Sequence, residues 1–536
     1  MQESKNSKKR IVSGAGVLAI GGIVAKMLGA LYRIPLTNVL GAEGMGMYQL
    51  VFPVYALFMV LSTLGIPTAL SRIIAEKRVL GEPYKKYFAS GMLALFLLGT
   101  FFCALVFALA KPLANWQGNQ STYIGFVVIA PAIPLVAIIS GFRGFFQGQM
   151  NMLPTAISNV VEQIVKLAVG IALAVALSKR GVTYAVCGAL LGVAVSELVT
   201  VVYMFATYLY HARKGVCAKE KICKITKEER ASMLHIALPI AAVSVLMPLT
   251  NFFDSVIVVN MLKAHGIQES VATAQYGLAS GPVNSLINVP VVAIMSLAVA
   301  IVPSVSASKA TRDVEGVMLK SRLCVRVAYF VGIPFAFFFM IFAKSIISTI
   351  YPTLSQSSLI VATNVLRITA INVVSLSVMQ IYFSLLQALD KTKYAVLSLV
   401  CAICIKIVLA VFLTKSIGIY GFAISSVAMG AVALLGVNIA YLKICGMHLA
   451  KNVGVNLLLG VIIALCGAGI MAIVSNYIVR LCLGAIVCFG VYVWLAILFG
   501  VLSKADMQHL PFGRALKKMH RIIRFWEYDN EIGRSS

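Results

Sequence analysis

Long apolar runs, each of about 20 residues or more, recur from one end of this chain to the other. A helix needs a run of this length to cross the hydrocarbon core of a bilayer, whereas outer-membrane strands are shorter and alternate polar with apolar residues. The runs therefore predict an all-α, polytopic membrane protein. We place fourteen transmembrane helices, at residues 11–40, 48–71, 88–110, 122–142, 154–178, 183–210, 233–262, 274–303, 324–350, 358–389, 395–414, 419–442, 453–474 and 481–502.

Composition excludes the other broad classes of protein. Of the 536 residues, 60% are hydrophobic and only 12% are charged, against about 25% charged in a soluble domain. So few charges cannot cover a soluble enzyme, and such an apolar chain is neither disordered nor a secreted disulfide scaffold. The chain has no metalloprotease, phosphate-loop or nucleophile-elbow motif, so we predict a transporter with no cofactor.

The eleven cysteines predict neither disulfides nor a metal site. Cys401 and Cys404 form a C-x-x-C pair, but the pair lies inside an apolar run that lacks a second pair of ligands. Packing is the better interpretation of these two cysteines, because a structural metal site needs four ligands.

The formal net charge of +27 indicates topology rather than a nucleic-acid partner. With the amino terminus placed inside, 33 of the 45 lysines and arginines fall on the inner side, 6 in outer loops and 6 within spans. Lysine and arginine concentrate in cytoplasmic loops. The distribution therefore predicts that both termini are cytoplasmic.

An internal repeat divides the chain. Gly181 to Gly188 opens the sixth span as Gly418 to Ser425 opens the twelfth, and similar matches end the fourth and tenth spans and the second and eighth. Six spans separate each pair, which predicts two six-helix lobes with a transport site between them. The predicted parts are a cytoplasmic amino terminus (1–10), an N-lobe (11–210), a linker (211–232), a C-lobe (233–442), two added helices (453–502) and a cytoplasmic tail (503–536).

Charged residues inside the spans are the first candidates for a binding site, because each is costly in a bilayer unless paired or hydrated. Lys26 and Arg33 are seven residues apart and share one face of the first helix. Glu162 and Lys166 are four apart, in the order that favours an ion pair. This second pair has two open interpretations, a structural pair and a functional one. The remaining charges within spans are Glu197, Asp254, Lys344, Arg367 and Lys406.

Six bases against three acids within the spans favour an anionic substrate, because lysine and arginine bind phosphate. We predict that the cavity is lined by Lys26, Arg33, Glu162, Lys166, Asp254 and Arg367. Helix breakers and charges near the inner ends predict a gate or hinge at Pro67, Arg72, Arg143, Pro154 and Pro282.

The tail forms a basic amphipathic pattern. From Pro511 onward its apolar residues recur on one helical face and five basic residues supply the charge. Such a helix is expected to lie on the anionic lipids of the inner leaflet. The apolar face consists of Leu516, Met519, Ile523 and Trp526.

Two segments resemble stage V sporulation protein B-like flippases. One runs from Phe142-Arg143-Gly144 through Met152 to Ser158 and on to Glu162-Gln163, and matches the connection between the fourth and fifth helices. The other holds Lys26-Met-Leu-Gly29, Arg33, Pro35 and Leu40-Gly-Ala-Glu-Gly44 and resembles the first helix. The resemblance covers essentially the whole chain.

This resemblance implies membership of the multidrug/oligosaccharidyl-lipid/polysaccharide exporter superfamily, related to lipid II flippases and placed in the bacterial cytoplasmic membrane. It also implies that Lys26 and Arg33 line a central cavity. Lys26 stands where the relatives commonly have arginine, and Arg33 precedes Ile34 rather than aspartate.

Together these features predict outward translocation, by alternating access, of an undecaprenyl-pyrophosphate-linked oligosaccharide, a precursor of peptidoglycan such as lipid II or of another polysaccharide. The partners are then this anionic glycolipid and membrane lipids, with a coupling cation left open. The alternative is a cation-coupled multidrug exporter of the same superfamily, which cavity carboxylates would favour. A membrane glycosyltransferase would need a large outer loop with clustered carboxylates, and the sequence has none.

Overall fold

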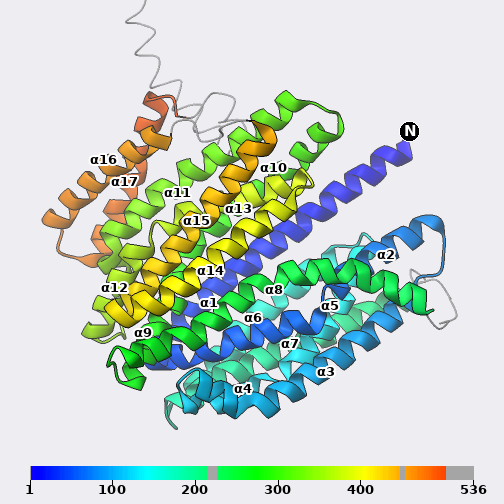
Figure 1. Cartoon of the computed structure of the whole chain (residues 1–536), viewed down its shortest axis with the longest axis horizontal. Coiled ribbons are helices and arrows are strands. Elements are labelled where there is room, and N and C mark those ends of the chain that lie inside the picture. Colours follow the sequence, from blue (N-terminus) through cyan, green and yellow to red (C-terminus); the bar gives the residue numbers. More distant parts are fainter. Residues whose placement is uncertain (1, 214–225, 447–452, 502–536) are drawn as a thin grey trace, which may run out of the picture. The chain divides into compact units, whose positions relative to one another are not determined.

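The computed structural model describes residues 2–213, 226–446 and 453–501, and all of its regular elements are helices (Figure 1). The predicted tail (503–536) and most of the linker (211–232) lie outside the described residues. The α-helices are α1 (Gln2–Thr63), α2 (Ile66–Leu80), α3 (Lys85–Trp116), α4 (Tyr123–Ile129), α5 (Ala132–Gly148), α6 (Leu153–Ser178), α7 (Val182–Arg213), α8 (Lys227–Ala264), α9 (Glu269–Leu278), α10 (Asn284–Ala310), α11 (Val314–Ile350), α12 (Gln356–Thr369), α13 (Asn372–Ala388), α14 (Thr392–Ile417), α15 (Ile419–Cys445), α16 (Val453–Ile473) and α17 (Tyr477–Leu498).

The predicted all-helical membrane architecture is confirmed. The described residues hold 12 helical stretches long and apolar enough to cross a membrane, or 13 if α12 and α13, which meet at a 43° bend, form one span. Residues 16–79 count as one of these stretches, but its 64 residues are about three times the length that one crossing needs, and it contains nearly all of the predicted spans 11–40 and 48–71. Within it the backbone leaves the helical region at Gly41, which has a φ of 67°.

Breaks in the helices follow glycine and proline. Gly41 and Gly65 have left-handed backbones, which cost glycine little because it has no Cβ. Gly65 separates α1 from α2 within the predicted second span. Pro282 lies in a five-residue π-helical turn, η2 (Ala279–Val283), between α9 and α10. The predicted eighth span is therefore two helices joined by a π-turn, a feature often found at functional sites.

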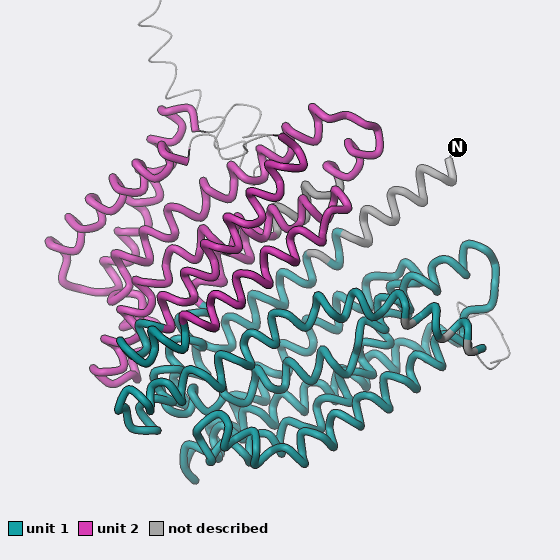
Figure 2. Tube along the Cα trace, viewed as in Figure 1, with its two compact units in different colours: residues 1–285, 410–421 teal, residues 286–409, 422–536 magenta. Residues whose placement is uncertain are grey.

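By internal contacts the chain forms two compact units (Figure 2). Unit 1 contains residues 1–285 and 410–421, and unit 2 contains residues 286–409 and 422–536. The hydrophobic core of unit 1 includes the side chains of Tyr32, Leu36 and Phe126, which are almost fully buried. The predicted lobes were defined by the repeat rather than by contacts, so their boundaries stay a prediction.

Turns of the same kind recur at repeat-related positions. Met150 follows α5 with a φ of 59°, and Asp390 follows α13 with a φ of 57°. Gly181 precedes α7 and Gly418 precedes α15, again with positive φ. Left-handed conformations at non-glycine residues are uncommon. Their recurrence about 240 residues apart supports the repeat inferred from the sequence.

Candidate functional site

Arg33 of α1 is held by a residue that is distant in the sequence. Its Nη1 donates to the Oγ of Ser285 at 2.9 Å, and that hydroxyl donates to the carbonyl oxygen of Gly281 in the π-turn at 2.7 Å. Ser285 is neutral, so this contact orients the guanidinium without cancelling its charge. The predicted cavity residue Arg33 is thus tied to the turn that contains the predicted hinge Pro282.

Lys26 lies two helical turns earlier on α1, and its side chain is exposed. Among the described residues the ammonium has no hydrogen bond or ion pair. The predicted common face with Arg33 follows from their spacing, but the two cations differ in surroundings, since Arg33 is half-buried. An exposed cation within an apolar span is available to an anionic ligand.

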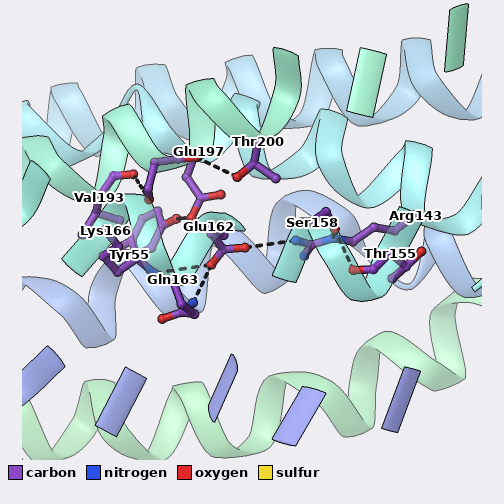
Figure 3. A network of polar contacts seen from close by, with 11 residues as sticks. Tyr55, Arg143, Thr155, Ser158, Glu162, Gln163, Lys166, Val193, Glu197 and Thr200 are labelled. Atoms are coloured by element: carbon purple, nitrogen blue, oxygen red, sulfur yellow. Dashed lines mark hydrogen bonds and ion pairs between the residues drawn. The ribbon is translucent and has the colours of Figure 1, made fainter. Parts of the chain in front are cut away.

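A second group of polar residues lies between α5 and α6 (Figure 3). The predicted ion pair is present, with the Nζ of Lys166 3.4 Å from the Oε1 of Glu162. Arg143, predicted as a gate residue, donates from Nη2 to the other oxygen of Glu162 and from Nε to Ser158, each at 3.0 Å. Gln163 also donates to Glu162 at 3.0 Å. One carboxylate therefore accepts from two cations and an amide.

Glu197 of α7 adds a second carboxylate to this region (Figure 3). Only 3% of Glu197 is exposed, and its Oε1 accepts a hydrogen bond from the phenol of Tyr55 at 3.5 Å. We name Arg143, Glu162, Lys166 and Glu197 the N-lobe charge cluster. With all four ionised its formal charges sum to zero, which is how charges are tolerated inside an apolar protein.

Sequence analysis did not predict the contact of Glu197 with Tyr55. The two residues are 142 positions apart, so no periodicity along one helix relates them. The sequence shows only that each residue is a polar side chain within a predicted span, and this property is shared by too many residues to pair these two.

Close packing of α1 on α9 is the feature of unit 1 that sequence analysis missed altogether. A Cβ placed on Gly46 would lie 2.1 Å from the carbonyl oxygen of Thr273, and one on Gly277 would lie 2.3 Å from the backbone nitrogen of Gly46. The Nε2 of Gln49 donates to the carbonyl of Ser280 at 2.7 Å. Only glycine permits backbones to approach this closely.

Polar side chains at the end of α3 join the same region. Gln117 donates to both the carbonyl of Leu50 and the hydroxyl of Ser255 at 2.8 Å, and Asn119 donates to Thr273 at 3.0 Å. Gln117 is fully buried, and Asn119 is nearly so. We call Gly46, Gln49, Gln117, Asn119 and Gly277 the outer seal, because the predicted topology places these residues toward the outer ends of their helices. The seal connects α1 and α3 of the predicted N-lobe with α8 and α9 of the predicted C-lobe, all within unit 1.

The remaining predicted site residues are dispersed. Asp254 is buried in α8, whereas Arg367 lies exposed on α12 in the other unit. Arg72 of α2 is exposed and Pro154 begins α6. Pro67, near the start of α2, lies against α5, where a Cβ on Gly144 would come within 2.5 Å of its carbonyl oxygen.

No group of three or more His, Cys, Asp or Glu side chains is arranged to hold a metal ion within residues 2–213, 226–446 and 453–501. The exposed Cys401 and Cys404 are free cysteines.

Comparison with known proteins shows the family of this chain. The family described as polysaccharide biosynthesis proteins matches residues 11–309, more than half of the sequence. The chain belongs to the polysaccharide biosynthesis protein family. A second family, MatE, matches residues 239–412 of this family member.

The similar proteins include membrane proteins of Bacillus subtilis (strain 168). Stage V sporulation protein B is 26% identical over 351 residues, which cover 64% of this chain and 67% of that protein. The lipid II flippase MurJ is 25% identical over 450 residues, 80% of this chain and 81% of MurJ.

Two solved structures show the same fold. A lipid II flippase MurJ in an inward closed conformation aligns with a TM-score of 0.73 at 13% identity, covering 90% of this chain and 98% of that one. An inward-facing multidrug resistance MATE family transporter of the MOP superfamily aligns with a TM-score of 0.65 at 16% identity, covering 78% of this chain and 95% of that one. The predicted superfamily is confirmed, and this family member is a multi-pass membrane transporter rather than an enzyme.

Proposed function

We propose that this transporter is a flippase, which moves a polyprenyl-pyrophosphate-linked oligosaccharide outward across the bacterial cytoplasmic membrane. The observation that carries the proposal is the pair of cations on α1: an exposed Lys26, and Arg33 held by a neutral hydroxyl. Both are suited to the pyrophosphate, Lys26 as a point charge and Arg33 as a planar fork. The family and its flippase relatives support the same substrate class.

The proposed transport step is alternating access in which the outer seal opens. Gly46 and Gly277 must separate for α1 and α9 to part, and the hydrogen bonds of Gln49, Gln117 and Asn119 must break. Arg33 is linked to Ser285 just beyond the π-turn. The headgroup would therefore bind to a side chain that already joins α1 to the residue after the π-turn, and this contact would couple the substrate to movement of α9.

The same seal suggests the direction of the cycle. On the predicted topology it lies toward the outer side, so we propose that its opening releases the substrate outward. Glu162, Lys166, Asp254 and Arg367 remain proposed cavity residues, with the N-lobe charge cluster as a charge-balanced support beside α1.

A cation-coupled multidrug exporter is the second candidate, favoured by the MatE match and by the MATE-like fold. It requires carboxylates that stay accessible to an organic cation. In the N-lobe charge cluster, however, Glu162 already accepts from Arg143 and Lys166.

Reconstitution distinguishes the two. Purified protein in liposomes is tested for outward movement of lipid II, of a lipid-linked polysaccharide unit and of a cationic dye, with the doubly substituted Lys26→Ala/Arg33→Ala protein as the control. The proposal requires movement of at least one lipid-linked sugar that the double substitution removes. Transport of the dye alone, unaffected by that substitution, would show a drug exporter instead.

A further inference from the structure

A cavity in unit 2 is not explained by the proposed transport path. It has a volume of about 300 Å³ and lies where the end of α10, the start of α11, the residue after α13 and the end of α15 meet. This volume is at the lower end of the range for small-molecule sites. Its lining includes Lys309, Arg312, Val317, Met318, Leu389 and Ile444.

The chemistry of this lining is amphipathic. Val317, Met318, Leu389 and Ile444 supply an apolar wall, and Lys309 and Arg312 place two cations beside it. Lys309 is already engaged, because its Nζ lies 2.5 Å from a carboxylate oxygen of Asp390.

Arg312 provides a positive charge that is available to an anionic ligand. It is exposed, and its side chain has no hydrogen bond or ion pair with a described residue. Its backbone is left-handed, with a φ of 56°, a conformation that is uncommon for residues other than glycine. Asp313 also lines the cavity, and its carboxylate caps α11, where it accepts from the backbone nitrogen of Gly316 at 2.8 Å.

We infer that this cavity binds an anionic phospholipid of the inner leaflet, with the phosphate at Arg312 and the glycerol and upper acyl chain against the apolar wall. Basic pockets between the cytoplasmic ends of transmembrane helices commonly bind such headgroups. The sequence from Lys309 to Arg326 is one of the strongly basic inner segments on the predicted topology, which places the cavity at that leaflet.

Charge argues against a second candidate occupant of this cavity, the tail of the chain. Its predicted helix carries Arg514, Lys517, Lys518, Arg521 and Arg524. A helix so basic would bring like charges to Arg312, whereas a phospholipid with a net negative headgroup complements it.

The test is native mass spectrometry of the purified full chain, titrated with phosphatidylglycerol or with phosphatidylcholine of the same acyl chains. We expect the intact protein to retain phosphatidylglycerol preferentially and Arg312→Gln to weaken that binding about fivefold, the usual effect of one cation at a membrane surface. Lys443→Gln is the matched control, because Lys443 is an exposed cation in the last turn of α15 that does not line the cavity.

A second variant tests the cavity without changing charge. Val317→Trp fills the space beside Arg312 and should also reduce phosphatidylglycerol binding, with a thermal unfolding curve to confirm that the variant is folded. Equal binding of the two lipids, or an equal loss in Lys443→Gln, would show diffuse surface charge and overturn the proposal. Displacement by soluble glycerol phosphate would overturn it too, since the site would then bind a free phosphate. The site is separate from the α1 cations, so failure here leaves the proposed transport function unaffected.

Discussion

Lys26 and Arg33 occupy one face of α1, but they differ in their surroundings and therefore in their expected contribution to substrate binding. Arg33 is held by Ser285, whereas Lys26 is exposed and has no bond to a described residue. A preorganised guanidinium loses less entropy on binding phosphate than a free ammonium does. We therefore expect Arg33 to contribute more to substrate affinity than Lys26.

Arg33→Ala should lower flippase activity about 10- to 100-fold, because a charge-assisted hydrogen bond contributes about 1.5–3 kcal/mol. Lys26→Ala should have a smaller effect, and Lys26→Arg should keep most activity. The measurement is transport in liposomes at matched protein levels. Full activity in both alanine variants would show that the substrate binds elsewhere.

Glu162 has two cationic partners, so substitution of Glu162 should lower the stability of the protein more than substitution of either partner. Glu162→Gln leaves Arg143 and Lys166 uncompensated, and loss of one member of a buried pair costs about 3–5 kcal/mol. Combining Glu162→Gln with Lys166→Met removes both charges of this pair and should recover much of the membrane abundance.

Lys77→Gln is the control for this experiment, because the Lys77–Glu82 pair is more exposed and such surface pairs contribute little to stability. Recovery of abundance without recovery of transport in the double variant would identify the pair as functional. Recovery of both would leave it as a structural pair.

Acid sensitivity is predicted at Glu229, which precedes the membrane-spanning part of α8. Lys86 donates to its carboxylate at 2.7 Å, as does Tyr87, and the backbone of Thr226 donates at 3.0 Å. These bonds lower the pKa of Glu229 to about 2. Because the folded pKa lies below the unfolded value of about 4.3, the stabilisation is complete above that value and is lost as pH falls toward 2.

Glu229→Gln should therefore unfold at a lower temperature than the native protein near neutral pH, and the difference should shrink between about pH 4.3 and 2. Thermal unfolding at a series of pH values measures it. Glu228→Gln, at the neighbouring exposed residue, is the control. A difference that does not change with pH would show that Glu229 acts through packing alone.

At the scale of elements, the outer seal depends on two helices that touch at their backbones. Gly46→Ala would place a methyl group 2.1 Å from a carbonyl oxygen that cannot rotate away, so α1 and α9 must separate. We expect lower transport and increased labelling, by an impermeant maleimide, of a cysteine placed at Gln49 in a cysteine-free protein. Gly22→Ala on the same helix is the control, because nothing lies within 4 Å of its added Cβ. Unchanged labelling in Gly46→Ala would exclude the seal as a gate.

At the scale of the whole molecule, the bias in lysine and arginine predicts which loops face the cytoplasm. A cysteine at Glu82, between α2 and α3, should resist an impermeant reagent in intact cells, while one at Ser121, after α3, should react. The opposite pattern would reverse the topology and with it the assigned sides of the outer seal and the lipid cavity.

Sequence alone determined the features that depend on local composition and spacing. Twenty-residue apolar runs can only be satisfied in a bilayer as helices, and a four-residue spacing on one helix brings Glu162 to Lys166. Family membership also followed from local motifs. What only the tertiary structure decided were contacts between distant segments: Arg143 with Glu162, Tyr55 with Glu197, Arg33 with Ser285, and Gly46 with Gly277. Helix periodicity determines which residues share a face, but not which helix that face meets, because the partner is selected by the packing of the whole unit.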